Sequence, residues 1–339
     1  MREPDFWYRP PSAVSLLLSP LGAIYGMLAG RRMGRPGLNA GIPVLCVGSY
    51  HLGGAGKTPM VLVLAMLLRD LGETPIVVSR GYGGSLRGPI IVDPARHQAD
   101  EVGDEPLMLA GKLPVVVVAR DRIDGVATAK SQNASVILMD DGFQSSAIAK
   151  DASLIVIDSD RGLGNGQVFP AGPLRAPLPS QIARTDALVV VGDGPAAAAV
   201  AAAVAAQGRL VSRAHLKADE AAVLSLRGKR VLAFAGIGDP GRFFRTLRSY
   251  GIDVAAERGF PDHHPFSNDE IATLIGQARR ESLTLVTTEK DMARLRNVEG
   301  AQAIVPFGVT LVPENPTLLR KFVTDILFES PTRKFQAGR

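Results

Sequence analysis

A glycine-rich loop between a predicted strand and a predicted helix constrains the fold of this chain more than any other feature. The loop reads Gly53-Gly54-Ala55-Gly56-Lys57-Thr58. Residues 42–47 form a short apolar run before it, and the apolar residues of 59–71 recur at helical spacing. In such a loop, backbone N–H groups surround phosphate oxygens, the lysine reaches the β- and γ-phosphates, and the threonine hydroxyl binds Mg²⁺. We therefore predict a P-loop, with an incidental glycine-rich turn as the alternative.

The loop departs from the strict P-loop spacing at one position. The pattern G-x-x-x-x-G-K-[ST] requires a glycine at position 51, where this chain has His51. A search with the strict pattern misses the loop, so its place between strand and helix carries the prediction. His51, His97 and Cys46 do not have the spacing of metal ligands, and we expect no structural zinc.

Strand-length apolar runs alternate with helix-length segments along the chain. They occupy 75–79, 114–119, 135–139 and 153–157 and, after a Pro/Gly-rich stretch at 169–179, 187–191, 230–235 and 283–287. This alternation favours a mostly parallel sheet flanked by helices. We predict an α/β fold in which 36–170 form a P-loop kinase domain and 171–339 form a second, smaller α/β domain that closes the nucleotide cleft.

The segment 12–30 is almost uncharged and has about the length of a membrane span. It contains Ser15, Pro20 and Gly22, which make it a marginal span. Aromatic residues precede it and arginines follow it, namely Phe6, Trp7, Tyr8, Arg31, Arg32 and Arg35. This order is typical of a helix in the membrane interface, with arginines near anionic lipid. We predict an interfacial membrane helix in 1–35; a buried helix of a soluble protein is the alternative.

The overall charge is mildly positive. Lys and Arg number 38 and Asp and Glu number 33, which gives a formal net charge of +5. The excess suits an anionic ligand or membrane surface, and the absence of a Lys/Arg block interleaved with aromatic residues argues against nucleic acid.

The single Cys46 cannot form an internal disulfide, so we expect a reducing, cytoplasmic setting.

Two acidic residues, Asp140 and Asp141, follow the apolar run 136–139. A buried strand there delivers them at its carboxyl end, where open α/β sheets bind ligands. Adjacent residues of an extended chain point to different faces, so one carboxylate can bind Mg²⁺ while the other orients a loop or substrate. The sequence leaves open which one binds the metal; a turn or helix cap is the alternative.

Several further motifs occur in order over about residues 3–330. They are Ser79-Arg80-Gly81-Tyr82-Gly83, Val102-Gly103-Asp104-Glu105-Pro106, Asp140-Asp141-Gly142-Phe143-Gln144, Gly164-Asn165-Gly166, Pro170-Ala171-Gly172-Pro173-Leu174-Arg175, Ala235-Gly236-Ile237-Gly238, Asp262-His263 and Thr288-Glu289-Lys290-Asp291. Together with the P-loop they resemble the tetraacyldisaccharide 4'-kinases, which are membrane-associated lipid A 4'-kinases. The combination is specific, whereas no single motif is.

The resemblance implies transfer of the γ-phosphoryl group of ATP to the 4'-hydroxyl of a tetraacylated glucosamine disaccharide 1-phosphate. It also implies ATP and Mg²⁺ as cofactors and a peripheral enzyme at the cytoplasmic face of the inner membrane. An acylated substrate cannot easily leave a bilayer, at ~0.8 kcal/mol per exposed CH₂. A P-loop kinase or NTPase with a soluble acceptor and a nucleotide switch are the alternatives. The oligomeric state is not predicted.

The resemblance also suggests roles for individual residues. It implies that Asp104 is the base and acts with His263, while Lys57 binds the phosphates and Asp141 serves in catalysis. Thr58 is the expected metal ligand, together with Asp140 or Asp141. Without the resemblance, Asp104 would be interpreted as a helix N-cap.

Three further residues are candidates for substrate binding. Arg80 and Tyr82 follow a predicted strand; an ordinary turn without a binding role is the alternative. Arg175 has a planar guanidinium with donors in a fixed arrangement, which is suited to phosphate. The family usually has an acid after that arginine, but this chain has Ala176. Any role of that carboxylate is therefore missing or supplied elsewhere.

Overall fold

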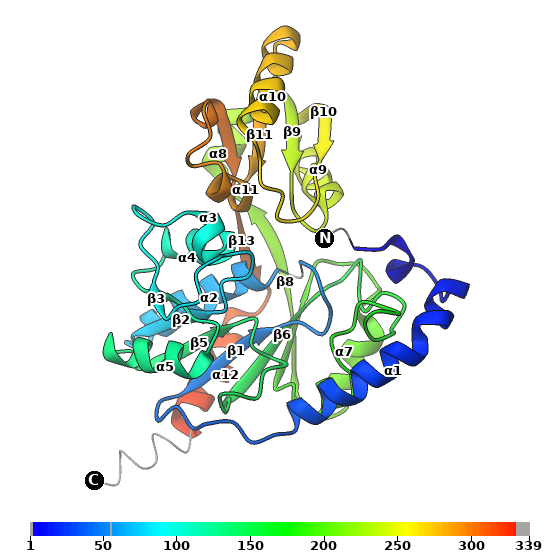
Figure 1. Ribbon diagram of the computed structural model, residues 1–339, viewed down its shortest axis with the longest axis vertical. Coiled ribbons are helices and arrows are strands. Elements are labelled where there is room, and N and C mark those ends of the chain that lie inside the picture. Colours follow the sequence, from blue (N-terminus) through cyan, green and yellow to red (C-terminus); the bar gives the residue numbers. More distant parts are fainter. Residues whose placement is uncertain (1–2, 55, 330–339) are drawn as a thin grey trace.

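The computed structural model describes residues 3–54 and 56–329. It contains a larger body built on one sheet, a smaller body built on a second sheet, and a long N-terminal helix along the side of the larger body (Figure 1). Ala55, predicted as part of the phosphate-binding loop, lies outside the described residues.

The larger sheet has nine strands in the order β13-β8-β7-β6-β1-β5-β2-β4-β3. Only the edge strands β13 and β3 run antiparallel to their neighbours. The strands are β1 Val44–Gly48, β2 Pro75–Ser79, β3 Ile90–Ile91, β4 Val116–Val118, β5 Val136–Asp140, β6 Ala152–Asp158, β7 Ala187–Val191, β8 Leu210–Ala218 and β13 Val309–Pro313. The predicted mostly parallel sheet is confirmed.

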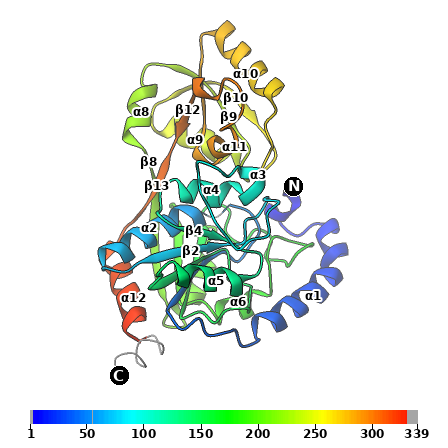
Figure 2. The same cartoon turned by 60° about the vertical axis from the view of Figure 1, so that its left-hand side comes forward.

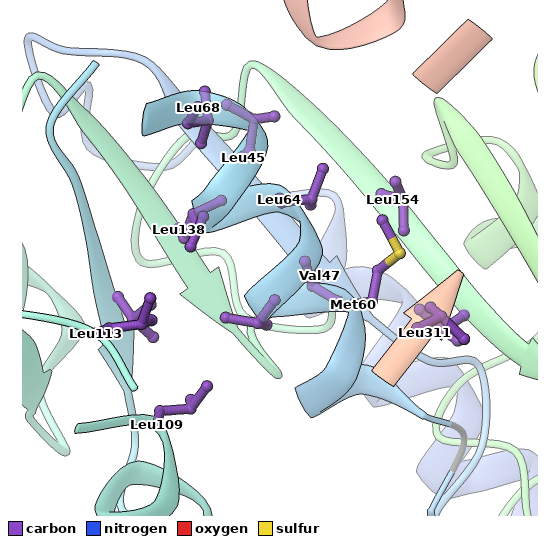
Figure 3. Packing of buried hydrophobic residues seen from close by; sticks show 14 of the residues in the cluster. Leu45, Val47, Met60, Leu64, Leu68, Leu109, Leu113, Leu138, Leu154 and Leu311 are labelled. Atoms are coloured by element: carbon purple, nitrogen blue, oxygen red, sulfur yellow. The ribbon is translucent and has the colours of Figure 1, made fainter. Parts of the chain in front are cut away.

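Helices cover both faces of this sheet, which explains why its central strands are continuous aliphatic runs rather than alternating patterns. α2 (Lys57–Asp70), α4 (Asp104–Ala110) and α12 (Pro316–Glu329) pack on one face, whereas α5 (Arg122–Ser131), α6 (Leu178–Ile182) and α7 (Ala198–Ala205) pack on the other. Figure 3 shows Met60 and Leu64 of α2 among the leucines of β1, β5 and β6. This packing fixes α2, and thus the P-loop that precedes it, against the sheet.

The smaller sheet has four parallel strands in the order β10-β9-β11-β12. They are β9 Arg230–Ala235, β10 Asp253–Gly259, β11 Thr284–Thr288 and β12 Ile304–Phe307. The helices of this body are α8 Glu220–Leu226, α9 Pro240–Ser249, α10 Asn268–Glu281 and α11 Glu289–Arg294, and a short 3-10 turn covers Ala301–Ala303. Its core contains Phe234, Phe244 and Phe307.

The predicted domain boundary at residue 170 is wrong, although the second α/β body exists. β7, β8 and β13 belong to the larger sheet, and the smaller body is an insertion between β8 and β13, over residues 219–308. These two strands pair with each other and lead from one body to the other (Figures 1 and 2). The Pro/Gly-rich stretch at 169–179 is instead part of the connection between β6 and β7, two neighbours in the larger sheet.

The N-terminal helix α1 (Ala13–Met33) begins with a capping box formed by Ser12 and Ser15. Its inner face has glycines where the segment 168–180 approaches: a Cβ on Gly22 would lie 2.7 Å from the carbonyl oxygen of Val168. A short 3-10 helix, Asp5–Tyr8, precedes α1 and buries Trp7. The predicted helix is confirmed; it extends through Arg31 and Arg32, and Arg35 lies beyond its end.

The opposite face of α1 is apolar and exposed. Leu17, Leu21, Ile24 and Leu28 recur at helical spacing, and Leu17 is 81% exposed. We call these four residues the apolar stripe. Within the described ranges, α1 is the one helix long and apolar enough to cross a membrane by length and composition, with a mean hydropathy of 1.6. The remaining short helix α3 spans Ala99–Val102.

Candidate active site

The glycine-rich loop has the backbone that a P-loop requires. Gly53 has φ +95° and Gly56, the N-cap of α2, has φ +86°, both in the left-handed region that favours glycine. Lys57 and Thr58 begin the helix and are buried. The loop therefore places the N-terminus of a 14-residue helix at the carboxyl end of β1, a site suited to phosphate.

The acidic pair lies beside this loop because β5 pairs in parallel with β1, with Val47 opposite Asp140. Asp141 has φ +49°, which turns the chain sharply after the strand. Its Oδ1 lies 3.6 Å from Nζ of Lys57, and Nζ is 3.4 Å from the Ser49 hydroxyl oxygen. The P-loop lysine is thus held by groups from two neighbouring strands.

Arg175 binds Asp141 with both arms of its guanidinium. Nη1 donates to Oδ1 at 2.8 Å and Nη2 donates to Oδ2 at 3.0 Å, while Nε donates to the His51 carbonyl oxygen at 3.1 Å. Desolvation raises the pKa of Asp141, but the charges of Arg175 and Lys57 outweigh it and hold the pKa far below its usual range. Arg175 was predicted to bind substrate; its fork instead positions a carboxylate here.

Asp140 has a different environment. Its Oδ2 accepts a hydrogen bond from the Ser79 hydroxyl at 3.3 Å, whereas Oδ1 is buried and has no hydrogen-bond partner within the described chain. Burial raises the pKa of Asp140 to about 7, and the negative charges of Glu105 and Asp141 contribute. A buried carboxylate oxygen without a partner requires an explanation, and a cation supplies one.

Asp104 and His263 meet although 159 residues separate them in sequence. Asp104 is the first residue of α4, after Gly103 with φ +92°, and His263 follows β10 with φ +57°. Nδ1 of His263 lies 2.9 Å from Oδ2 of Asp104. Gly103 is the N-cap of this helix, so the capping alternative for Asp104 is wrong. The pair joins one residue from each body of the molecule.

Two cations from α11 surround the same carboxylate. Nζ of Lys290 lies 3.9 Å and Nε of Arg294 lies 3.2 Å from Oδ2 of Asp104. Burial raises the pKa of Asp104, but Lys290, His263 and Arg294 together lower it to about 2. Lys290 is also 3.5 Å from Nε2 of His263. In the sequence, the segment 288–291 is only one of the motifs shared with the family, and nothing there points to Arg294.

The remaining predicted residues lie at the same edge of the sheet. Arg80 and Tyr82 follow β2, the neighbour of β5, and both are exposed. The Tyr82 ring centroid lies 5.1 Å from that of His263. The structure therefore brings Tyr82 to the acid–imidazole pair and leaves Arg80 accessible beside it.

The smaller body also contacts the P-loop directly. A Cβ on Gly238 would lie 3.5 Å from the backbone nitrogen of Gly54. Arg242 of α9 forms an ion pair with Asp158 at the end of β6, and Arg161, further along that loop, pairs with Glu3. These ion pairs were not predicted, because the partners are far apart in sequence.

Removing the Arg175 fork is expected to lower kcat about 10- to 100-fold, the usual effect of losing a group that orients a site carboxylate. Arg175→Ala leaves Asp141 with Lys57 alone, whereas Arg175→Lys keeps the charge and loses the bidentate geometry. We expect the lysine variant to recover only part of the rate. Steady-state kinetics measure both variants, and wild-type kcat in Arg175→Ala would exclude a positioning role.

The two halves of the site come together at Glu105. Its negative charge acts on Asp140 at the P-loop, and its Oε1 lies 3.2 Å from Lys290 beside Asp104. A nucleotide-binding loop this close to an acid–imidazole pair is the arrangement of a P-loop kinase, which activates an acceptor hydroxyl beside bound phosphates. The model of the tetraacyldisaccharide-1-P 4'-kinase family matches residues 14–327. The chain belongs to this family.

Curated relatives and a solved structure agree with this assignment. The chain is 65% identical to a tetraacyldisaccharide 4'-kinase of Bradyrhizobium diazoefficiens, over 99% of both chains. It is 64% identical to one of Nitrobacter hamburgensis, over 96% of this chain and 98% of that one. The crystal structure of LpxK from Aquifex aeolicus in complex with ATP is 26% identical and has a TM-score of 0.67, covering 93% of this chain and 99% of that one.

Proposed function

We propose that this kinase transfers the γ-phosphoryl group of ATP to the 4'-hydroxyl of a tetraacylated glucosamine disaccharide 1-phosphate, a step of lipid A biosynthesis. The observation that carries the proposal is the 2.9 Å contact between Asp104 and His263 beside the P-loop. Family membership indicates the acceptor, and the site supplies the parts that the chemistry needs: a phosphate cradle, a cation site and a group that activates a hydroxyl.

The phosphate cradle consists of the loop backbone, the N-terminus of α2 and Lys57. The amides and the helix dipole favour negative charge, and the buried ammonium of Lys57 adds a full positive charge at the same place. Gly53, Gly54 and Gly56 allow the backbone to approach the phosphates closely. These groups fit a triphosphate, and the similar LpxK structure, which was solved in complex with ATP, favours ATP as the nucleotide.

Mg²⁺ fits the residues beside the cradle. The unpartnered Oδ1 of Asp140 and the Thr58 hydroxyl at the start of α2 are hard oxygen donors of the kind that Mg²⁺ prefers. Both oxygens of Asp141 accept from Arg175, so Asp140 is the better ligand of the two and Asp141 orients Lys57. When bound, the ion neutralises charge on the phosphates.

Asp104 and His263 act together on the acceptor hydroxyl. The low pKa of Asp104 keeps its carboxylate ionised at neutral pH, so it holds the imidazole through Nδ1 and stabilises the imidazolium. The pair takes the proton of the hydroxyl as the oxygen attacks phosphorus. General base catalysis of this kind contributes ~10²–10⁴-fold. Tyr82 and Arg80 border the place where the sugar must lie.

The acylated acceptor explains the apolar stripe of α1. Because its acyl chains stay in a bilayer, the enzyme docks on the membrane, with the stripe in the acyl boundary and Arg31 and Arg32 at headgroup level. Peripheral association at the cytoplasmic face of the inner membrane follows. An enzyme acting on a soluble acceptor would have no use for such a stripe.

The test is incubation of the purified protein with ATP, Mg²⁺ and the tetraacylated disaccharide 1-phosphate. We expect mass analysis to find one added phosphoryl group, and NMR to place it on the 4' oxygen. The same disaccharide stripped of its acyl chains is the matched control. Faster turnover of the stripped acceptor would favour the soluble-acceptor alternative, and ATP hydrolysis without a phosphorylated product would favour a nucleotide switch.

Placing charge on the apolar stripe is expected to weaken vesicle binding at least tenfold. Each exposed aliphatic side chain contributes about 1.5–3 kcal/mol when fully buried, and about 1.4 kcal/mol corresponds to tenfold. The variant is Leu21→Glu/Ile24→Glu, and Leu224→Glu, also at an exposed position but in the smaller body, is the control. Vesicle flotation measures binding. Equal flotation of the stripe variant and the control would exclude docking through α1.

A further inference from the structure

A cavity of about 310 Å³ opens at the end of the larger sheet that lies away from the P-loop. Its lining comes from the segments that lead into β1 and β7, from the β5–β6 loop between Phe143 and Asp151, and from Met33 at the end of α1. The charged residues of the lining are Arg35, Lys150, Asp151, Arg184 and Asp186, and Met33 lies beside them. Because the P-loop follows the carboxyl end of β1, this cavity is separate from the candidate active site.

Three cations line the cavity, and Lys150 is the most enclosed of them. Its Nζ donates to the carbonyl oxygens of Phe143 and Ser145. Burial lowers the pKa of Lys150, and the positive charges of Arg122 and Arg184 lower it further. The Lys150 ammonium is partly buried and lies near other positive charges, both of which disfavour its charged form. An anion that enters the cavity therefore stabilises it.

The two carboxylates of the cavity are engaged by the protein itself. Asp151 accepts from the backbone N–H of Val44 at 2.8 Å. Asp186 accepts from the backbone N–H of Ser153 at 2.9 Å and from Arg209 at 3.1 Å. Both acids thus hold neighbouring strands in place, and Asp186 has its own arginine. Lys150 and Arg184 donate to carbonyl oxygens, which carry no full negative charge, so the positive charge of these side chains still favours an anion in the cavity.

The cavity is joined to the helix that carries the apolar stripe. Nε of Arg184 donates to the carbonyl oxygen of Met33, the last residue of α1, at 3.1 Å. Arg35 lies two residues after Met33, beyond the C-cap Gly34, and Arg31 and Arg32 lie in the last turn of the helix. Figures 1 and 2 show α1 along the outside of the larger body. A membrane that takes up the stripe therefore meets this cationic end of the helix at headgroup level.

We propose that the cavity binds the phosphate headgroup of an anionic glycerophospholipid of the membrane on which α1 docks. The inference rests on the membrane docking in the proposed function. An arginine fork matches phosphate oxygens and a lysine adds a compact charge. The exposed Arg35 offers such a fork, whereas Arg184 and Lys150, which donate to backbone carbonyl oxygens, add positive charge beside it. The volume lies at the lower end of the ~300–1,000 Å³ of small-molecule sites, so it suits a headgroup. The lipid would fix the orientation of the enzyme on the bilayer.

Binding of short-chain dihexanoylphosphatidylglycerol, measured by calorimetry below its micelle concentration, tests the proposal. We expect Lys150→Gln and Arg35→Gln each to weaken binding at least tenfold. Arg32→Gln removes one charge at the same end of α1 but outside the cavity, and we expect unchanged binding. Thermal unfolding checks that Lys150→Gln still folds, and the exposed Arg35 provides a variant that does not depend on it.

Two outcomes would overturn the proposal. Equal binding of the lipid by all four proteins would exclude the cavity. Inorganic phosphate binding as tightly as the lipid would exclude a lipid headgroup in favour of free phosphate.

Vesicle flotation on neutral and phosphatidylglycerol-containing vesicles separates this inference from membrane docking. If wild type floats with neither, the docking in the proposed function fails, and with it the lipid assignment, whatever the calorimetry shows. If wild type floats and both cavity variants lose its preference for anionic vesicles, both ideas are supported. We expect Arg35→Gln to keep the wild-type kinase rate on micellar substrate, because Arg35 is exposed and lies on the segment that leads into β1, at the strand end away from the P-loop.

Discussion

Asp104→Asn is expected to lower kcat by about 10²–10⁴-fold while ATP affinity changes little, because general base catalysis contributes that much and the phosphate cradle is untouched. The amide can neither accept a proton nor stabilise an imidazolium on His263, so the acid–imidazole pair no longer takes the proton of the acceptor hydroxyl. Steady-state kinetics give kcat, and calorimetry with ATP gives the affinity. Lost ATP binding with normal kcat at saturation would contradict the assignment of the base.

A double-mutant cycle sharpens this test. If Asp104 and His263 act as one unit, Asp104→Asn/His263→Asn is no slower than the slower single variant, because the second change removes a group that is already disabled. Fully additive losses would mean that the two residues act separately. Tyr82→Phe is a useful control, since it keeps the ring beside His263 and leaves the pair intact.

The same carboxylate gives a pH signature in stability. Its pKa in the folded state is about 2, below the ordinary value of 3.8, so its ionisation stabilises the fold at neutral pH. That contribution, on the order of 2 kcal/mol, is present above about pH 4 and is lost as the pH falls through 2. The stability difference between wild type and Asp104→Asn should therefore shrink over that interval, as followed by urea unfolding.

Lys57→Ala is expected to impair both nucleotide binding and turnover. Hydrogen bonds to charged groups contribute ~1.5–3 kcal/mol, so ATP should bind about 10- to 100-fold more weakly. Loss of a charge that stabilises the transferred phosphoryl group should lower kcat by a further ~10²–10³-fold. Removing the ammonium also frees Asp141, which lies 3.6 Å from it. The variant therefore changes the cradle and the acidic pair together.

Arg69→Ala is the control for this variant. Arg69 lies in the last turn of the same helix α2 and is exposed, so its removal tests whether any cationic loss on this helix would act alike. We expect wild-type ATP affinity and kcat. A Lys57→Ala protein that binds ATP normally would refute the phosphate-binding role of the loop.

The P-loop side of the site was predictable from sequence because its signals are local. A buried strand, a glycine loop and an apolar helix follow one another within 30 residues, and the acids stand at the end of a strand whose other four residues are apolar. β10 was missed because its residues are mostly exposed and carry charge. The predicted domain boundary at residue 170 was wrong because β13 pairs with β8 in the larger sheet, with Val309 opposite Ala218. No local sequence pattern indicates this long-range pairing.

The other side of the site depended on the resemblance. Nothing local distinguishes His263 from His264, yet the structure gives them different partners: His264 pairs with Glu270 and stacks on Phe260. The binding of Arg175 to Asp141, 34 residues away, was likewise invisible, and an arginine in a proline-rich segment was read as a phosphate ligand. The roles of His263 and Arg175 depend on partners that are far away in the sequence, and the spacing of residues along the chain does not reveal those partners.

The central claim is that the loop ending in Lys57 and Thr58 holds a triphosphate whose terminal phosphate is presented to Asp104 and His263. A crystal structure with a nonhydrolysable ATP analogue and Mg²⁺ tests it most directly. We expect phosphate density against the loop amides and Lys57, the cation on Thr58 and Asp140, and the terminal phosphate on the side of the acid–imidazole pair. An empty loop in the presence of bound analogue elsewhere, or a terminal phosphate directed away from Asp104, would contradict it.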